Sequence, residues 1–131
     1  MKKMQFMFFT LITSLFLFVQ CATGNAFKDI SVDDLYGKLK NDANIFILDV
    51  RTENEYANDG HIKGSKLIPV QVLKARLSEI DNKKNVEVYV ICRSGGRSSR
   101  ASGLLSKMGF KKVYNVLGGM TAWISKKYPA E

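Results

Sequence analysis

The sequence predicts an α/β domain in which a mainly parallel sheet has helices on both faces. Short apolar runs alternate with segments of helical spacing, which is typical of strand–helix–strand units. The best runs are continuously apolar, as in strands that are buried on both faces. No repeat or low-complexity linker interrupts this pattern, and 131 residues suffice for one ordinary domain but not for two.

Caps and breaks in the sequence place the boundaries of the elements. Ser31 precedes a segment with acidic residues in its first turn, so we expect it to cap the first helix. Thr52 caps a short acidic helix that stops before Gly60. Pro69 ends a short strand, and Gly109 ends a helix with an apolar face. In chain order, the expected elements are helix 32–40, strand 45–48, helix 53–58, strand 66–68, helix 70–77, strand 86–91, helix 98–108, strand 112–116 and a final helix with Ala122, Trp123 and Tyr128.

Composition excludes several classes of protein. Two prolines and ten glycines rule out a collagen-like or long disordered chain. Two cysteines rule out a disulfide scaffold, and one histidine rules out a His-rich metal site. We therefore expect neither a metal nor a cofactor.

The first residues predict an export signal rather than part of the domain. Lys2 and Lys3 precede an apolar run over residues 6–19, and small residues follow it. As a helix, this run reaches about 21 Å, which is short of a hydrocarbon core of about 30 Å. We expect a signal peptide over residues 1–24, cleaved between residues 20 and 26, and a single domain over 27–131 in an exported, periplasmic protein.

Two alternatives for this segment stay open. Cys21 directly follows the apolar run, and its position resembles that of the lipid-accepting cysteine in bacterial lipoprotein signals. Gln20 departs from that pattern, in which a small residue precedes the cysteine. The segment can therefore serve as a cleaved signal, as the signal of a membrane-anchored lipoprotein, or as an uncleaved membrane anchor.

The excess of basic residues favours a small anionic substrate as much as nucleic acid or an anionic surface. Without Lys2 and Lys3, 18 of the 20 basic residues remain, against 12 acidic residues. These charges are spread in ones and twos, and no aromatic residues are interleaved among them, so nothing supports nucleic acid as a partner. The sequence does not indicate an oligomeric state.

The segment around Cys92 has the composition of an anion-binding loop with a nucleophile. Cys92 directly follows the strongest predicted strand and precedes a helix, at the sheet edge where ligands of α/β folds bind. Glycines let such a loop curl until its N–H groups converge, and the helix N-terminus and nearby cations lower the pKa of a cysteine. We expect substrate contacts from Arg93, Ser94, Gly95, Gly96, Arg97 and Ser98. The alternative is a buried structural cysteine beside a solvated basic turn.

Three motifs resemble the rhodanese-homology (sulfurtransferase) domain family. They lie in order between about residues 30 and 128: DVR at 49–51 with GHIKGS at 60–65, CRSGGRS at 92–98, and NVLGGMTAW at 115–123. The resemblance implies a three-layer rhodanese-like fold with a five-stranded sheet, and a Cys92 that carries sulfane sulfur as a persulfide. In that reaction the Cys92 thiolate takes the outer sulfur of a donor such as thiosulfate and passes it to cyanide or a thiol. Asp49 and Arg51 are expected to support the site structurally, as is His61 in its turn.

Three other functions compete with this interpretation. A cysteine-dependent phosphatase has five residues between cysteine and arginine, whereas four separate Cys92 from Arg97. A disulfide oxidoreductase commonly needs a second cysteine, and removal of the signal would leave Cys92 alone. A non-catalytic or regulatory sulfur-carrier or binding module is compatible with the loop, although Cys92 and both arginines are present.

Overall fold

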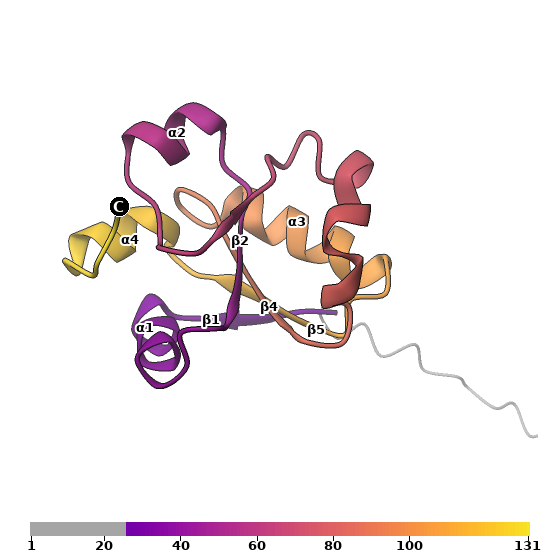
Figure 1. Ribbon diagram of the computed structural model, residues 1–131, viewed down its shortest axis with the longest axis horizontal. Coiled ribbons are helices and arrows are strands. Elements are labelled where there is room, and N and C mark those ends of the chain that lie inside the picture. Colours follow the sequence, from indigo (N-terminus) through magenta and orange to yellow (C-terminus); the bar gives the residue numbers. More distant parts are fainter. Residues whose placement is uncertain (1–25) are drawn as a thin grey trace, which may run out of the picture.

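A five-stranded parallel sheet organises residues 26–131, the part of the chain that this computed structural model describes (Figure 1). The strands lie in the order β1-β5-β4-β2-β3, and every neighbouring pair is parallel. Their bounds are β1 Lys28–Ile30, β2 Phe46–Asp49, β3 Lys66–Leu67, β4 Glu87–Ile91 and β5 Lys112–Val116. The predicted α/β class with five strands is confirmed, and the sheet is entirely rather than mainly parallel.

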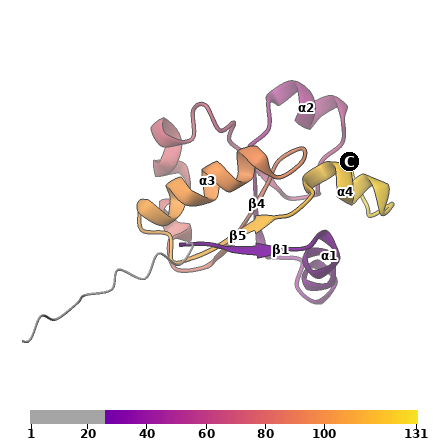
Figure 2. The same cartoon turned by 180° about the vertical axis from the view of Figure 1, so that it is seen from behind.

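Helices cover both faces of the sheet (Figures 1 and 2). α1 and α4 lie on one face, where the ring of Tyr36 meets the edge of Trp123 with 5.8 Å between centroids. α3 and the 3₁₀ helix η1 lie on the other face, and α2 stands beyond the carboxyl end of β2 (Figure 1). The bounds are α1 Val32–Asn41, α2 Glu53–Asn58, η1 Lys74–Lys83, α3 Gly96–Lys107 and α4 Gly119–Ser125.

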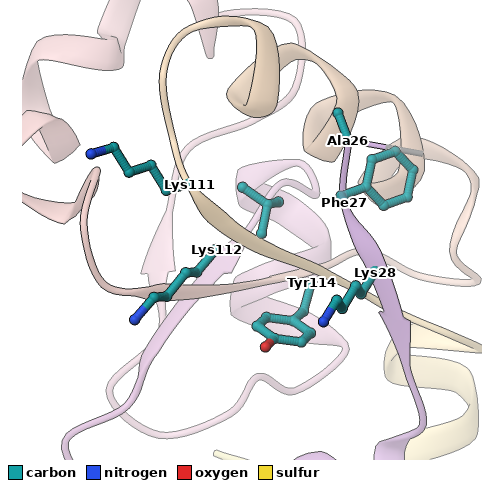
Figure 3. Close-up of a pocket in the computed structure, with 7 residues that line it drawn as sticks. Ala26, Phe27, Lys28, Lys111, Lys112 and Tyr114 are labelled. Carbon is teal, nitrogen blue, oxygen red and sulfur yellow. The ribbon is translucent and has the colours of Figure 1, made fainter. Parts of the chain in front are cut away.

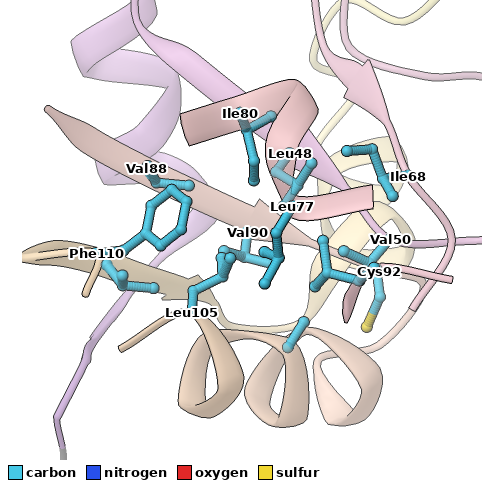
Figure 4. Packing of buried hydrophobic residues seen from close by; sticks show 13 residues of the cluster. Leu48, Val50, Ile68, Leu77, Ile80, Val88, Val90, Cys92, Leu105 and Phe110 are labelled. Atoms are coloured by element: carbon cyan, nitrogen blue, oxygen red, sulfur yellow. The ribbon is translucent and has the colours of Figure 1, made fainter. Parts of the chain in front are cut away.

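The central strand β4 contributes to a separate apolar core on each face. Val88 and Val90 point toward α3 and η1, and Cys92 continues this alternation into the loop that follows (Figure 4). Tyr89 and Ile91 point to the opposite face, against α1 and α4. Side chains alternate along a strand, so a strand buried on both faces must be apolar throughout. The same alternation places the Cys92 sulfur on the α3 side of the sheet.

The two predicted side-chain caps are confirmed. The Ser31 hydroxyl accepts a hydrogen bond of 3.0 Å from the N–H of Asp34 at the start of α1. Thr52 and Glu55 form a capping box at the start of α2, in which each side chain accepts from the other residue's backbone N–H. These bonds satisfy N–H groups that a helix leaves without internal partners.

The structure differs from the expected elements in four places. No strand was predicted at Lys28–Ile30, which pairs with β5 as β1. The predicted helix 70–77 is displaced along the chain: residues 70–73 form turns, with the N–H of Val70 donating to Val50 O, and the helix is the 3₁₀ helix η1 at Lys74–Lys83. Two other bounds shift, because α3 begins at Gly96 and Tyr128 lies beyond the end of α4.

A hollow of about 150 Å³ lies beside the starts of β1 and β5 (Figure 3). Cys92 follows the carboxyl end of β4, at the opposite end of the sheet. It is lined by Ala26, Phe27, Lys28, Lys111, Lys112, Val113 and Tyr114. Lys28 and Lys112 begin β1 and β5, so the hollow opens at the amino-terminal ends of parallel strands. The lining holds lysines and aromatic rings but no nucleophile or carboxylate, and it is not the candidate site.

The predictions for the N-terminal segment lie outside the described residues. The expected signal over 1–24, the cleavage between 20 and 26 and the lipidation of Cys21 all concern residues before Ala26. Between residues 26 and 131, the structure contains no helix that is both long and apolar enough to span a membrane.

Candidate functional site: the Cys92 loop

The sulfur of Cys92 lies in a cradle that the following loop and helix form. Cys92 directly follows β4, and only 1% of it is exposed. The N–H of Gly95 donates to Sγ over 3.1 Å, and Ser98 Oγ lies 3.3 Å from Sγ. Ser98 is itself fully buried in the first turn of α3. The site therefore holds a single sulfur atom against donors from both the loop and the helix.

These contacts favour the ionised form of the cysteine. Burial by itself raises the pKa of the Cys92 thiol, because an apolar environment disfavours charge. The Ser98 hydroxyl and the backbone N–H groups of Ser98, Gly95 and Ser94 oppose this, and together they hold the pKa below its ordinary value. A thiolate is the nucleophilic form of cysteine, so the cradle prepares Cys92 to react.

The amino-terminal end of α4 fixes the shape of the loop. The N–H of Met120 donates to Cys92 O over 2.8 Å, and the N–H of Thr121 donates to Arg93 O over 2.9 Å. In a planar trans peptide the C=O and N–H groups point in opposite directions. Because α4 draws the two carbonyls to its side, the N–H groups of Arg93 and Ser94 point away from α4, and that of Ser94 is among the donors that lower the pKa of Cys92.

Two glycines allow this close approach. Gly95 has a φ of 111°, a conformation that residues with a side chain rarely adopt. Gly119 has a φ of 54°, and a Cβ there would lie 2.6 Å from Arg93 O and even nearer to Cys92 O. The glycine pair at 118–119 therefore lies directly against the Cys92 loop, and α4 could not reach the loop carbonyls with a larger residue at 119.

The two arginines of the loop have different surroundings. Arg97 forms two hydrogen bonds with Glu55, of 2.8 and 2.7 Å. The two hydrogen bonds that Arg97 donates lower the pKa of Glu55 to about 2, and the same bonds to the Glu55 carboxylate raise the pKa of Arg97. Arg93 is exposed and makes no ion pair within residues 26–131. Of the two guanidinium groups that the sequence predicts for anion binding, Arg93 is the one available to a ligand.

Asp49 and Arg51 lie outside the Cys92 loop and bond to each other. They form a fully buried pair in which Nη2 of Arg51 lies 2.8 Å from Oδ2 of Asp49 and Nε donates to the same carboxylate. Nη2 also donates to Gly60 O over 2.8 Å, beyond the end of α2. Within the described chain, these bonds reach α2 and its flanks rather than the loop. The pair thereby positions α2, which carries Glu55 toward Arg97.

Sequence reasoning assigned no polar role to Asn115 or Asp29. Asn115 lies on β5, is 3% exposed, and places Oδ1 2.6 Å from Ser98 Oγ. Its Nδ2 donates to Asp29 on β1 over 3.1 Å. A signal was present in the sequence, because an asparagine inside an otherwise buried strand must find hydrogen-bond partners.

His61 has a structural environment. Its Nδ1 lies 3.0 Å from Tyr56 O, and its ring stacks on that of Tyr56 with 3.8 Å between centroids. The backbone of His61 pairs with Glu131 through two hydrogen bonds. Among residues 26–131, no cluster of three or more His, Cys, Asp or Glu side chains could hold a metal ion.

Comparisons with known proteins agree with this arrangement. The family model described as "Rhodanese-like domain" matches residues 31–126. A protein of Allochromatium vinosum named "Sulfurtransferase" is 33% identical over 102 residues, which are 78% of this chain and 92% of that protein. A protein of Bacillus subtilis named "Putative sulfur carrier protein YrkF" is 39% identical over 102 residues, and the match spans only 54% of that longer protein.

A solved structure extends the agreement from sequence to fold. The crystal structure of a rhodanese-like domain protein from Staphylococcus aureus superposes with a TM-score of 0.67 at 38% identity, covering 73% of this chain and 90% of that one. The family model spans most of the described residues, and it includes both the Cys92 loop and the glycine pair that supports it. The chain belongs to the rhodanese-like domain family of sulfurtransferases and sulfur carriers.

Proposed function

We propose that the protein is a thiosulfate sulfurtransferase in which Cys92 carries the transferred sulfur. The observation that carries this proposal is the cradle around Sγ, where Gly95 N–H and Ser98 Oγ contact the sulfur directly. The converging donors favour the thiolate even though burial opposes it, and the same donors suit a persulfide anion.

The first step loads the cysteine. The Cys92 thiolate attacks the outer sulfur of thiosulfate, a Cys–S–S bond forms as the sulfur–sulfur bond of the donor breaks, and sulfite leaves with the bonding electron pair. Arg93, exposed at the loop, attracts the dianionic donor. The donors around Sγ lower the pKa of the Cys92 thiol, which favours the thiolate that this attack needs.

The second step removes the transferred sulfur from Cys92. A nucleophilic acceptor attacks the outer sulfur of the persulfide, and Cys92 leaves as the thiolate. With cyanide the product is thiocyanate, and with a thiol it is a new persulfide. Cys92 is the free cysteine of residues 26–131, so the described domain offers no internal thiol and the acceptor comes from outside it.

A phosphatase function fits the site less well. The loop has four residues between Cys92 and Arg97 and is built around one sulfur atom. The Arg97 guanidinium, which would have to bind a phosphate oxyanion, is held by the Glu55 carboxylate at 2.7 Å. A sulfur carrier that is loaded but not turned over is the second candidate, supported by the name of the Bacillus subtilis relative.

We also propose that the domain acts outside the cytoplasm. The basic start and short apolar run before residue 20 support export to a periplasm, with a lipid anchor at Cys21 as the alternative. Cell fractionation and the mass of the mature N-terminus test this. A lipidated Cys21 would place the protein in the membrane fraction and add the mass of the lipid, whereas cleavage without lipidation would do neither.

Thiocyanate formation from thiosulfate and cyanide tests the enzymatic proposal. We expect turnover by the wild type and none by Cys92→Ser, with p-nitrophenyl phosphate left intact by both. Ser102→Ala is the matched control, because Ser102 is a buried serine one turn along α3 whose hydroxyl has no partner within residues 26–131. Phosphate ester hydrolysis without thiocyanate would overturn the proposal, and loading without turnover would favour a carrier.

A further inference from the structure

A line of hydrogen bonds runs from the Cys92 sulfur across the sheet to its edge strand. Sγ lies 3.3 Å from Ser98 Oγ, and Oγ lies 2.6 Å from Oδ1 of Asn115. Nδ2 of Asn115 donates to Oδ1 of Asp29 over 3.1 Å. Cys92, Ser98 and Asn115 are buried, whereas Asp29 is exposed. Residues of α3, β5 and β1 are thus connected to the sulfur atom through one line of hydrogen bonds.

Asp29 fixes which way the Asn115 amide faces. An ionised carboxylate only accepts hydrogen bonds, so the amide must present its NH₂ group to Asp29. Its carbonyl oxygen Oδ1 therefore faces Ser98. Two oxygen atoms 2.6 Å apart need a proton between them, and Oδ1 has none, so the Ser98 hydroxyl must supply it.

Ser98 has one hydroxyl proton for more than one acceptor. While the proton points to Asn115, Oγ offers Cys92 only a lone pair, which suits the S–H group of a neutral thiol. A thiolate has no proton to give and needs the Ser98 proton for itself. Gly95 O is a third acceptor for this proton, and it is a weaker one because it lies 3.1 Å from Oγ. When Cys92 ionises, the Ser98 hydroxyl must therefore turn its proton from Asn115 Oδ1 to the sulfur.

We propose that Asn115, oriented by Asp29, competes with the Cys92 sulfur for the hydroxyl proton of Ser98 and so limits how much thiolate the resting site holds. Asn115 and Asp29 are positioning residues that act through Ser98, and the inference rests on the proposed function only in taking Cys92 as the reacting group. The resting cysteine keeps more thiol than the cradle alone would allow, which slows its reaction with oxidants.

Two of the three arginines near the sulfur are paired with carboxylates, and the third is exposed. Arg97 of α3 is paired with Glu55 of α2, and on β2 and its following turn Asp49 is paired with Arg51. Arg93 is exposed on the loop. A substitution at Asn115 changes none of these contacts directly, so its effect on Cys92 ionisation reports on the Ser98 hydroxyl.

The pH dependence of Cys92 alkylation by iodoacetamide tests the competition, with the Cys92 peptide followed by mass spectrometry. We expect Asn115→Leu to move the midpoint of the rate profile about one pH unit lower, because the thiolate gains the whole Ser98 hydrogen bond. Asp29→Ala frees the amide to turn and gives a smaller shift in the same direction. Ser98→Ala moves the midpoint higher, and Ser102→Ala leaves it in place.

The double variant Ser98→Ala/Asn115→Leu gives the decisive result. If Asn115 acts through Ser98, this protein has the midpoint of Ser98→Ala alone. An Asn115→Leu midpoint that is unchanged or higher, or an Asn115 effect that persists without Ser98, would overturn the proposal. Asp29→Ala carries the same test at an exposed position if Asn115→Leu does not fold. Alkylation uses no sulfur donor, so the result is independent of whether thiocyanate is formed.

Discussion

Within residues 26–131, two α-helices begin with a side-chain cap and two begin after a glycine. Ser31 and Thr52 satisfy N–H groups at the starts of α1 and α2. α3 and α4 follow Gly95 and Gly118, both with positive φ, and neither has a side-chain cap. The uncapped starts are the two that meet the Cys92 loop. N–H groups at the start of α3 donate hydrogen bonds to the Cys92 sulfur, and those at the start of α4 donate to the carbonyls of the Cys92 loop.

This difference shows how one structural need is met in two ways. Every helix start leaves N–H groups without internal partners. At the starts of α1 and α2 a serine or threonine side chain satisfies them and stabilises the helix. At the site they are left for the Cys92 loop and its sulfur, and glycine allows the loop and helix to come close enough.

Of the substitutions considered, Gly119→Ala should have the largest effect, because it disrupts the contact between α4 and the Cys92 loop. The new Cβ would collide with the carbonyls of Cys92 and Arg93, and φ at 119 is positive. We expect a loss of about 3 kcal/mol in the free energy of unfolding, measured in urea, and a strong fall in thiocyanate formation.

Gly64→Ala is the matched control for that substitution. Gly64 also has positive φ, but a Cβ there would meet nothing within 4 Å. It should cost about 1 kcal/mol for backbone strain alone and leave sulfur transfer intact. Equal losses in the two variants would show that the loop tolerates a shift of α4.

Glu55→Gln should have an intermediate effect that depends on pH. Glutamine preserves the capping box of α2 but removes the ion pair with Arg97, so we expect a loss of about 1 kcal/mol in unfolding free energy at neutral pH. The pKa of Glu55 is lowered to about 2 in the folded protein. The carboxylate therefore stabilises the fold above its ordinary pKa, and this contribution is lost as the pH falls toward 2.

Urea unfolding at several pH values checks this dependence. The difference between wild type and Glu55→Gln should be constant near neutrality and shrink progressively in acid. A difference that is already absent at neutral pH would mean that solvent screens the Arg97–Glu55 pair completely.

Ser31→Ala should give the smallest effect on sulfur transfer, because it changes stability alone. The loss of its hydrogen bond to the N–H of Asp34 removes a cap worth about 1 kcal/mol. Thermal melting should show the decrease, whereas the kcat and KM for thiosulfate should match those of the wild type. A change in either kinetic constant would mean that the cap of α1 also influences the Cys92 loop.

The features that the sequence predicted well are local. Thr52 directly precedes α2, so the cap and the bounds of this helix follow from a short stretch of chain. The Cys92 loop is equally local, since the strand, the glycines and the helix that form it are consecutive.

The features that were missed depend on contacts between distant segments. β1 is three residues long and mostly exposed, and only its pairing with β5 makes it a strand. Arg97 and Glu55 are 42 residues apart, and nothing near Arg97 in the sequence indicates its partner. Asn115 and Asp29 are likewise brought together by strand pairing, which composition and periodicity do not specify.

The intact mass of the purified protein, before and after thiosulfate, tests most directly whether the cradle holds sulfur on Cys92. We predict that the wild type gains one sulfur atom, that cyanide removes it, and that Cys92→Ser never acquires it. A wild type whose thiol is shown to be free and that takes up no sulfur from thiosulfate or polysulfide would contradict the central claim.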